Sequence, residues 1–253
     1  MKLTVLMENT APEGLTREHG LSVYINYNNT HILLDGGSSG KFLENAKSLG
    51  VDITSIQLAA LSHGHYDHGD GLAAFLRANP SAEVWLRPAA LEEHWSDNGG
   101  THHYIGLSEE VKDLLAGRSR LADGPTRLLP GVWLVPDQVD HEQSLVLEGE
   151  DGLVILNSCC HAGAGYIVRG VKEQFPGKSV QALMGGLHLM GKNTHCLGVA
   201  PGIVKNLGKW LFEELEVGTL YTGHCTGDPA FELLKEAYPD RVARLTTGLT
   251  LEL

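Results

Sequence analysis

The stretch LAALSHGHYDHGDGL, residues 58–72, places three histidines and one aspartate within six positions. The apolar run IQLAAL before it predicts a buried strand, and DGLAAFLRANP after it predicts a helix that stops at Pro80. Neutral imidazole and carboxylate groups are ligands for Zn²⁺, iron and Mn²⁺. Capping of a helix N-terminus explains one histidine at such a position, but not three beside an aspartate. The stretch therefore predicts a metal site.

The spacing divides the ligands of this stretch into two pairs. Residues i and i+2 of an extended or tightly turned backbone can point to the same side, so we expect His63 and His65 to share one ion. Gly64 between them would leave room for that approach. Asp67 and His68 stand where the helix begins, and we expect them to serve a second ion.

Strand-like and helix-like segments alternate along the chain, which predicts an α/β fold in a single domain over residues 1–253. KLTVLM opens as a strand, and residues 22–35 predict a hairpin with its turn at Asn28–Asn29. RVARLTTGLTLEL is expected to close the chain as strand. Residues 95–130 form a predicted insertion, in which SDNGGTHHY is an irregular loop and LSEEVKDLLAGR is a short helix with Ser108 as its N-cap.

Histidines recur at the ends of later predicted strands, in the segments NSCCHAGAG, MGGLHLM and TGHCTG. These segments carry His161, His188 and His224. Because active sites of α/β sheets lie beyond the strand ends, we expect one site assembled from distant segments.

The composition excludes several classes of function. The formal net charge of −12 and the lack of a Lys/Arg run argue against nucleic acid as a partner. No apolar segment of ~20 residues and no signal peptide is present, so we expect no membrane partner and a cytoplasmic protein. The spacing of the four cysteines fits neither a disulfide framework nor a zinc ribbon, so we expect reduced thiols.

Four motifs in this order resemble those of the metallo-β-lactamase fold superfamily: LLDGG at 33–37, HxHxDH at 63–68, HAG at 161–163 and TGHCTG at 222–227. The resemblance covers nearly the whole chain. It implies a four-layer αββα sandwich of two mixed β-sheets flanked by helices. A subgroup labelled 7,8-dihydropterin-6-methyl-4-(β-D-ribofuranosyl)-aminobenzene-5′-phosphate synthase-like resembles the chain more closely, through EHGLS, SHGHYDH, CCHAG, GGLHL and GHCTG.

The resemblance implies a binuclear centre of two divalent ions, for which zinc is preferred and iron and manganese are alternatives. The implied metal ligands are His63, His65, Asp67, His68, His161 and His224. The first ion would take His63, His65 and His161. Asp67 would also act as the catalytic residue that orients the attacking water. Asp35 would lie behind the ligands or in the turn.

One departure from the superfamily pattern concerns the bridging aspartate after the third motif. No Asp or Glu occurs from Gln174 to Phe212, and the corresponding strand end reads MGGLHLM. Our hypothesis is that His188 reaches the second ion in place of that carboxylate. The alternative is that His188 only satisfies a loop hydrogen bond.

The remaining histidines and two of the cysteines have other predicted roles. His19, in EHGLS, either lines the site or is a partly exposed loop residue, and His102 and His103 either wall a substrate pocket or are solvated. Cys160 and Cys225 are expected to pack beside the ligands rather than to bind metal. Four histidines are expected to be ordinary: His31, His94, His141 and His195.

The implied function is a metal-dependent hydrolase, in which an activated hydroxide attacks an ester or phosphoester of a small, phosphorylated molecule. Two alternatives remain open: a transferase that joins a pterin to an arylamine, and a non-catalytic metal-bound sensor. A homo-oligomer is compatible with the sequence.

Overall fold

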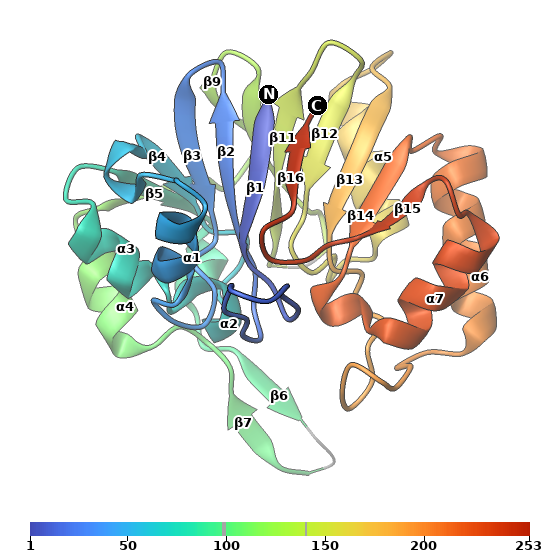
Figure 1. The fold of residues 1–253 in the computed structure, drawn as a ribbon, viewed down its shortest axis with the longest axis horizontal. Helices are drawn as coiled ribbons and strands as arrows, with labels where there is room; N and C mark the ends of the chain where they lie inside the picture. The colour runs from blue at the N-terminus through green and yellow to red at the C-terminus, as the bar shows by residue number, and fades with distance from the viewer. Residues whose placement is uncertain (98–99, 140) are drawn as a thin grey trace. The chain divides into compact units, whose positions relative to one another are not determined.

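The computed structural model describes residues 1–97, 100–139 and 141–253 as two compact units. Unit 1 comprises residues 1–123 and 246–253, and unit 2 comprises residues 124–245. Each unit contains one seven-stranded mixed sheet and its helices (Figure 1). Two large mixed sheets with helices confirm the predicted α/β class. The single-domain prediction for residues 1–253 stays a prediction.

The sheet of unit 1 has the strand order β16-β1-β2-β3-β4-β5-β8. Pairing is antiparallel from β16 to β3 and parallel from β3 to β8. The strands are β1 (Lys2–Met7), β2 (Ser22–Tyr27), β3 (Thr30–Leu34), β4 (Leu58–Ala60), β5 (Glu83–Leu86), β8 (Ser119–Leu121) and β16 (Thr250–Glu252). The helices of this unit are α1 (Phe42–Ser48), η1 (Ile53–Ser55), α2 (Tyr66–Gly69), α3 (Leu72–Ala78), η2 (Pro88–Leu91) and α4 (Glu109–Leu115).

The sheet of unit 2 repeats this plan, with the order β15-β14-β13-β12-β11-β10-β9. Pairing is antiparallel from β9 to β12 and parallel from β12 to β15. The strands are β9 (Thr126–Leu129), β10 (Val132–Pro136), β11 (Gln143–Glu148), β12 (Leu153–Leu156), β13 (Val180–Gly185), β14 (Thr219–Thr222) and β15 (Val242–Arg244). The helices are α5 (Ala164–Gln174), α6 (Pro201–Lys209), η3 (Trp210–Glu214), η4 (His224–Thr226) and α7 (Asp228–Ala237).

Helices cover one face of each sheet through apolar side chains at helical spacing. In unit 1, Phe42 of α1 and Phe75 of α3 are fully buried in one cluster with Leu33 of β3. In unit 2, Val168 of α5 and Val204 of α6 lie in a second cluster with strand residues. Truncating a buried phenylalanine to alanine typically costs about 3–5 kcal/mol, so these contacts fix the helices on the sheets.

The first predicted hairpin is confirmed, with β2 and β3 joined at Asn28 and Asn29. Both asparagines have positive φ angles of 50° and 63°, as a type I′ turn requires. The Oδ1 atom of Asn26 accepts a hydrogen bond from the backbone N–H of Asn29 at 3.1 Å. The helix after Ser108 is also confirmed, with Ser108 at the N-cap position of α4.

Two segments differ from the prediction. The segment expected to be an irregular loop forms a hairpin of β6 (Trp95–Asp97) and β7 (His102–Tyr104), which extends from unit 1 in Figure 1. Residues 98 and 99 of that loop lie outside the described residues. The final segment is two strands, not one, because the backbone leaves β15, crosses Gly248 at a φ of 84° and joins the other sheet as β16.

Candidate metal centre

The predicted ligands follow the carboxyl ends of parallel strands in both units. In unit 1, Asp35 follows β3, and the HxHxDH segment follows β4, its parallel neighbour. In unit 2, the segments with His161, His188 and His224 follow β12, β13 and β14, which are consecutive parallel neighbours. Because parallel strands end at one edge of a sheet, each unit gathers its own group of donors.

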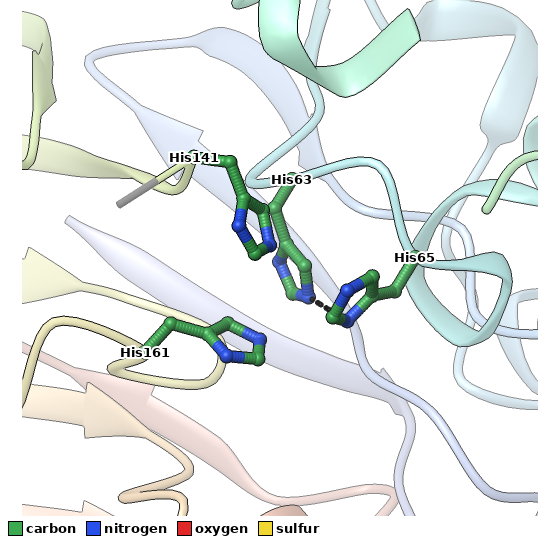
Figure 2. A group of neighbouring side chains, drawn as sticks. All are labelled: His63, His65, His141 and His161. Atoms are coloured by element: carbon green, nitrogen blue, oxygen red, sulfur yellow. Dashed lines mark hydrogen bonds between the residues drawn. The ribbon is translucent and has the colours of Figure 1, made fainter. Parts of the chain in front are cut away.

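The first pair of predicted ligands in unit 1 is His63 and His65. The Nε2 atom of His63 lies 3.1 Å from the Nδ1 atom of His65, the contact dashed in Figure 2. A tetrahedral ion with Zn–N bonds of ~2.0–2.1 Å separates two nitrogen ligands by roughly 3.3 Å. The pair therefore fits two nitrogen ligands of one ion.

Asp67 and His68 form the second pair, in the single turn of α2 that begins after His65. The Nε2 atom of His68 lies 3.6 Å from Oδ2 of Asp67, and both residues are buried. An imidazole nitrogen and a carboxylate oxygen at this distance fit neighbouring positions around a second ion.

A buried network behind these pairs assigns the histidine tautomers. Asp35 accepts hydrogen bonds at 2.7 Å from both the backbone N–H and the hydroxyl of Ser62. Its Oδ2 atom also lies 2.8 Å from Nδ1 of His68, so that Nδ1 carries the proton and Nε2 keeps its lone pair. Because the Ser62 hydroxyl donates to Asp35, Nδ1 of His63 donates to the Ser62 oxygen at 2.9 Å, so the lone pair of this imidazole is on Nε2, the atom that faces Nδ1 of His65. Asp35 thus lies behind the ligands.

His19 is placed beside Asp67. Its Nε2 atom lies 3.2 Å from Oδ2 of Asp67, and Asn9 donates to its Nδ1 atom at 3.3 Å. This orients the Nε2 proton of His19 toward the carboxylate, although the His19 side chain is 45% exposed. Burial raises the pKa of the neighbouring Tyr66, helped by the charges of Asp67 and Asp70, so its phenol stays protonated.

Gly64 is required for a reason that the sequence did not show. A Cβ atom at this position would lie 2.2 Å from the carbonyl oxygen of Ala90. The sequence predicts that Gly64 leaves room for His63 and His65 to approach one ion. The structure adds that the backbone of η2 packs against this glycine, which fixes the loop carrying His63 and His65.

In unit 2, the rings of three histidines are neighbours in space, and the ring of His161 is next to both of the others. The centroids of His141 and His161 are 4.8 Å apart, and those of His161 and His188 are 4.4 Å apart. Both His141 and His161 are drawn in Figure 2. Among the described residues, Cys159, His224 and Cys225 form a further group, whose ligand atoms all lie within 4.8 Å of one another.

Glu142 holds the turn that carries His161. This carboxylate is fully buried and accepts hydrogen bonds from the backbone N–H groups of Cys159 at 2.7 Å and His161 at 2.9 Å. Cys160, between them, packs into the apolar core as predicted. Burial raises the pKa of the Cys160 thiol well above its ordinary value, and the charge of Glu142 adds to this effect.

Strained backbone conformations concentrate at the motifs. In the part of the chain that the structure describes, seven non-glycine residues have positive φ, and four of them stand in these strand-end segments. They are Asp35, Cys160, His188 and His224, with φ between 47° and 58°. Such conformations cost about 1–3 kcal/mol each and are typical of functional sites.

His94 and His141 both lie near predicted ligands, and the prediction that His141 is ordinary requires correction. The His94 ring centroid lies 5.3 Å from that of His65, and its Nε2 atom donates to the Ala89 carbonyl. His141 lies beside His161 and is itself a candidate ligand. By contrast, His31 bonds Ser55 and His195 pairs with Asp228, both partly solvated. The exposed His102 and His103 lie on β7.

Comparison with known proteins identifies the family. The sequence profile described as the metallo-beta-lactamase superfamily matches residues 15–161, which is more than half of the chain. The chain belongs to the metallo-beta-lactamase superfamily. The superfamily consists largely of metal-dependent enzymes, in agreement with the histidine and carboxylate groups of both units.

Three similar proteins illustrate the range within this superfamily. A 7,8-dihydropterin-6-methyl-4-(beta-D-ribofuranosyl)-aminobenzene-5′-phosphate synthase of Methanocaldococcus jannaschii is 26% identical over 91% of this chain and 88% of its own. The structure of Tm1679, a metal-dependent hydrolase, matches with a TM-score of 0.84 at 27% identity, covering 100% of this chain and 99% of that one. A diphosphatase from the PhnP family matches at 18% identity with a TM-score of 0.59, covering 100% and 97%, and shares the fold.

No helix in the described residues is both long enough and apolar enough to cross a membrane.

Proposed function

We propose that this superfamily member is a metal-dependent hydrolase that cleaves an ester or phosphoester of a small molecule. The observation that carries the proposal is the arrangement of the HxHxDH segment. Its ligand atoms form two pairs, one with a separation of 3.1 Å and the other of 3.6 Å. Ser62 and Asp35 accept buried hydrogen bonds from Nδ1 of His63 and His68, which puts the lone pair of each ring on Nε2. Clustered neutral imidazoles with these tautomers are suited to binding divalent ions.

The proposed ligands follow the order of the superfamily motifs. His63, His65 and His161 would hold the first ion. Asp67, His68, His188 and His224 would hold the second. Zinc fits this nitrogen and oxygen donor set, and iron or manganese fits it as well.

The side chains have distinct roles in this proposal. When bound, a pair of divalent ions supplies an acidified water and stabilises negative charge that develops on the substrate. Asp67 accepts the hydrogen bond of His19 at Oδ2 and would orient the attacking water through its carboxylate. Asp35 and Ser62 hold the rings of His63 and His68 in the required tautomers. The water oxygen would bond to phosphorus or to the acyl carbon, and the alcohol would leave with a proton.

A phosphorylated small molecule is the substrate class that we favour. The name of the M. jannaschii relative contains a 5′-phosphate, and the net charge of −12 disfavours nucleic acid. The similarity to Tm1679 supports hydrolysis as the reaction.

Transfer is the second candidate, because the M. jannaschii relative is named a synthase. In this reaction an arylamine nitrogen would bond to the methylene carbon of a dihydropterin, while pyrophosphate leaves from that carbon. The same donors would then serve to hold the leaving group, and water would not be a reactant.

One experiment separates hydrolysis from transfer. The zinc-loaded protein is incubated with a panel of phosphomonoesters, phosphodiesters and carboxylic esters, and separately with a dihydropterin pyrophosphate and an arylamine. Release of alcohol and acid that disappears in Asp67→Asn and persists in Asp52→Asn supports the hydrolase, since Asp52 is an exposed carboxylate of the same unit that only caps η1. A coupled pterin–arylamine product without ester cleavage contradicts it and favours transfer.

A further inference from the structure

Two thiols and one imidazole gather within unit 2, in the loops after β12 and β14. The Sγ atoms of Cys159 and Cys225 and a ring nitrogen of His224 lie within 4.8 Å of one another. All three residues are buried, with 3%, 6% and 3% exposure. A tetrahedral ion with Zn–S bonds of ~2.3 Å and Zn–N bonds of ~2.0–2.1 Å separates such atoms by roughly 3.5–3.8 Å. The group needs only small side-chain adjustments to surround one ion.

The sulfur of Cys225 occupies the space beside Gly186. A Cβ atom added to Gly186 would lie 2.3 Å from Cys225 Sγ, 3.2 Å from its backbone nitrogen and 3.0 Å from the carbonyl oxygen of Ser158. Residue 186 therefore has no room for a carboxylate side chain, and the sequence offers no Asp or Glu from Gln174 to Phe212. Thiolates at Cys225 and Cys159 are anionic ligands that the loops at this end of the sheet can supply.

The loops that carry the two sulfurs are fixed by backbone hydrogen bonds. The carbonyl oxygen of Cys225 accepts from the N–H groups of Leu189 at 3.0 Å and Met190 at 2.9 Å. The hydroxyl of Thr226 accepts from the N–H of Leu187 at 3.0 Å. Glu142 holds the N–H of Cys159 from the other side. The donors are therefore held in place before an ion binds, which is the arrangement that favours a specific metal position.

We propose that Cys225 and Cys159, together with His224, form a thiolate-containing position for a thiophilic divalent ion such as zinc. Thiolates bind zinc well, and each thiol that binds releases its proton to solvent. The proposal deepens the proposed function and rests on it in one respect: His224 is the ligand assigned there to the second ion, so the two thiolates would be further ligands of that same ion and the expected count stays at two. It replaces the expectation that Cys225 only packs beside the ligands.

Cobalt substitution tests the proposal without reference to catalysis. The full chain is loaded with Co²⁺, and its near-ultraviolet absorption is recorded, because a cobalt–thiolate bond produces a charge-transfer band there that nitrogen and oxygen ligands do not. We expect the band in the parent protein, its loss in Cys225→Ser and its weakening in Cys159→Ser. The matched controls are Cys196→Ser, an exposed cysteine of the same unit, and Cys160→Ala, a buried one in the apolar core. Both controls should keep the band.

Zinc affinity provides a second readout. Cys225→Ser should bind zinc more weakly by at least the roughly 10–100-fold that loss of an outer-shell partner costs. Absence of the band in the parent protein overturns the proposal, whether or not a variant folds. A band that survives in Cys225→Ser overturns it equally. If the protein hydrolyses esters but shows no band, the thiolate position is rejected and the proposed function stands. If the band is present but no ester is hydrolysed, the thiolate position stands and the proposed function is rejected.

Discussion

Replacing Asp35 with asparagine changes the hydrogen-bond partner of His68 without changing the size of the side chain. Asp35 is fully buried and accepts three hydrogen bonds at 2.7–2.8 Å, two from Ser62 and one from Nδ1 of His68. In Asp35→Asn, one oxygen keeps the backbone N–H of Ser62. An amide NH₂ group then faces Nδ1 of His68, which must become an acceptor.

The tautomer of His68 is the source of the expected effect. When Nδ1 accepts, the proton moves to Nε2, and Nε2 no longer offers a lone pair toward an ion. Loss of such a partner typically weakens metal binding 10–100-fold, about 1.4–2.7 kcal/mol. The loss of a charge-assisted hydrogen bond should also lower the free energy of unfolding by about 1.5–3 kcal/mol.

Zinc affinity is measured by competition with a chromophoric chelator, and folding is checked by urea titration. Asp52→Asn serves as the control, because Asp52 caps η1 in the same unit and lies at the surface. We expect wild-type zinc affinity for Asp52→Asn and a 10–100-fold loss for Asp35→Asn. A folded Asp35→Asn protein that binds zinc with wild-type affinity would refute the assigned tautomer and the supporting role of Asp35.

Three further predictions concern the framework of the centre. In Glu142→Gln, the new amide NH₂ group faces one of the two buried backbone N–H groups of Cys159 and His161, so two donors face each other. We therefore expect the free energy of unfolding, measured by urea titration, to fall by about 1–3 kcal/mol. Gly64→Ala places a Cβ 2.2 Å from the Ala90 carbonyl oxygen, so we expect a loss of about 1–3 kcal/mol and weaker zinc binding. Burial, and after it the charge of Glu142, raises the pKa of the Cys160 thiol in the folded protein. The stability that this thiol contributes is therefore complete below the ordinary thiol pKa of about 9. It is lost as the pH rises from there toward the pKa of the folded protein. Above about pH 9, the free energy of unfolding of the parent should therefore fall more steeply than that of Cys160→Ala, by up to about 1.4 kcal/mol per pH unit.

Each of these predictions has a control and a contradicting result. Glu150→Gln, at the exposed β11–β12 turn, should leave stability unchanged, and equal values for both glutamine variants would refute the role of Glu142. Gly124→Ala introduces a Cβ with no neighbour within 4 Å, and a Gly64→Ala protein of equal stability would contradict the close packing against η2. Parallel pH curves for the parent and Cys160→Ala would show that the thiol titrates alike in the native and unfolded states.

The sequence predicted well those features that depend on near neighbours in the chain. His63, His65, Asp67 and His68 are close in sequence, so their pairing follows from the backbone of one loop and one turn of helix. The Asn28–Asn29 turn was equally predictable, because few residues other than glycine and asparagine favour positive φ at both positions.

The features that the sequence did not reveal depend on contacts between distant residues. Glu142 precedes a strand and resembles any surface acid in sequence, but its carboxylate reaches backbone groups 17 and 19 residues away. Ser62 became informative only when Asp35, 27 residues earlier, was placed beside it. No sequence motif contains His141, and only the fold brings its ring beside His161.

Hairpin β6–β7 was missed for a different reason. The segment has no alternation of apolar and polar residues, and all three residues of β7 are exposed. Its stability comes from cross-strand contacts such as that of Trp95 with Tyr104, whose ring centroids are 5.2 Å apart. Such a pair is invisible to periodicity, since the two residues are far apart in the loop.

The content of metal per chain tests the central claim of a binuclear centre most directly. It is measured by inductively coupled plasma mass spectrometry on protein purified without chelator and on protein reconstituted with zinc. We predict about two ions per chain for the parent and about one for His188→Ala, since His188 is assigned to the second ion. One ion in both proteins would contradict the binuclear centre and the role of His188, and no bound ion after reconstitution would contradict the metal-dependent mechanism as a whole.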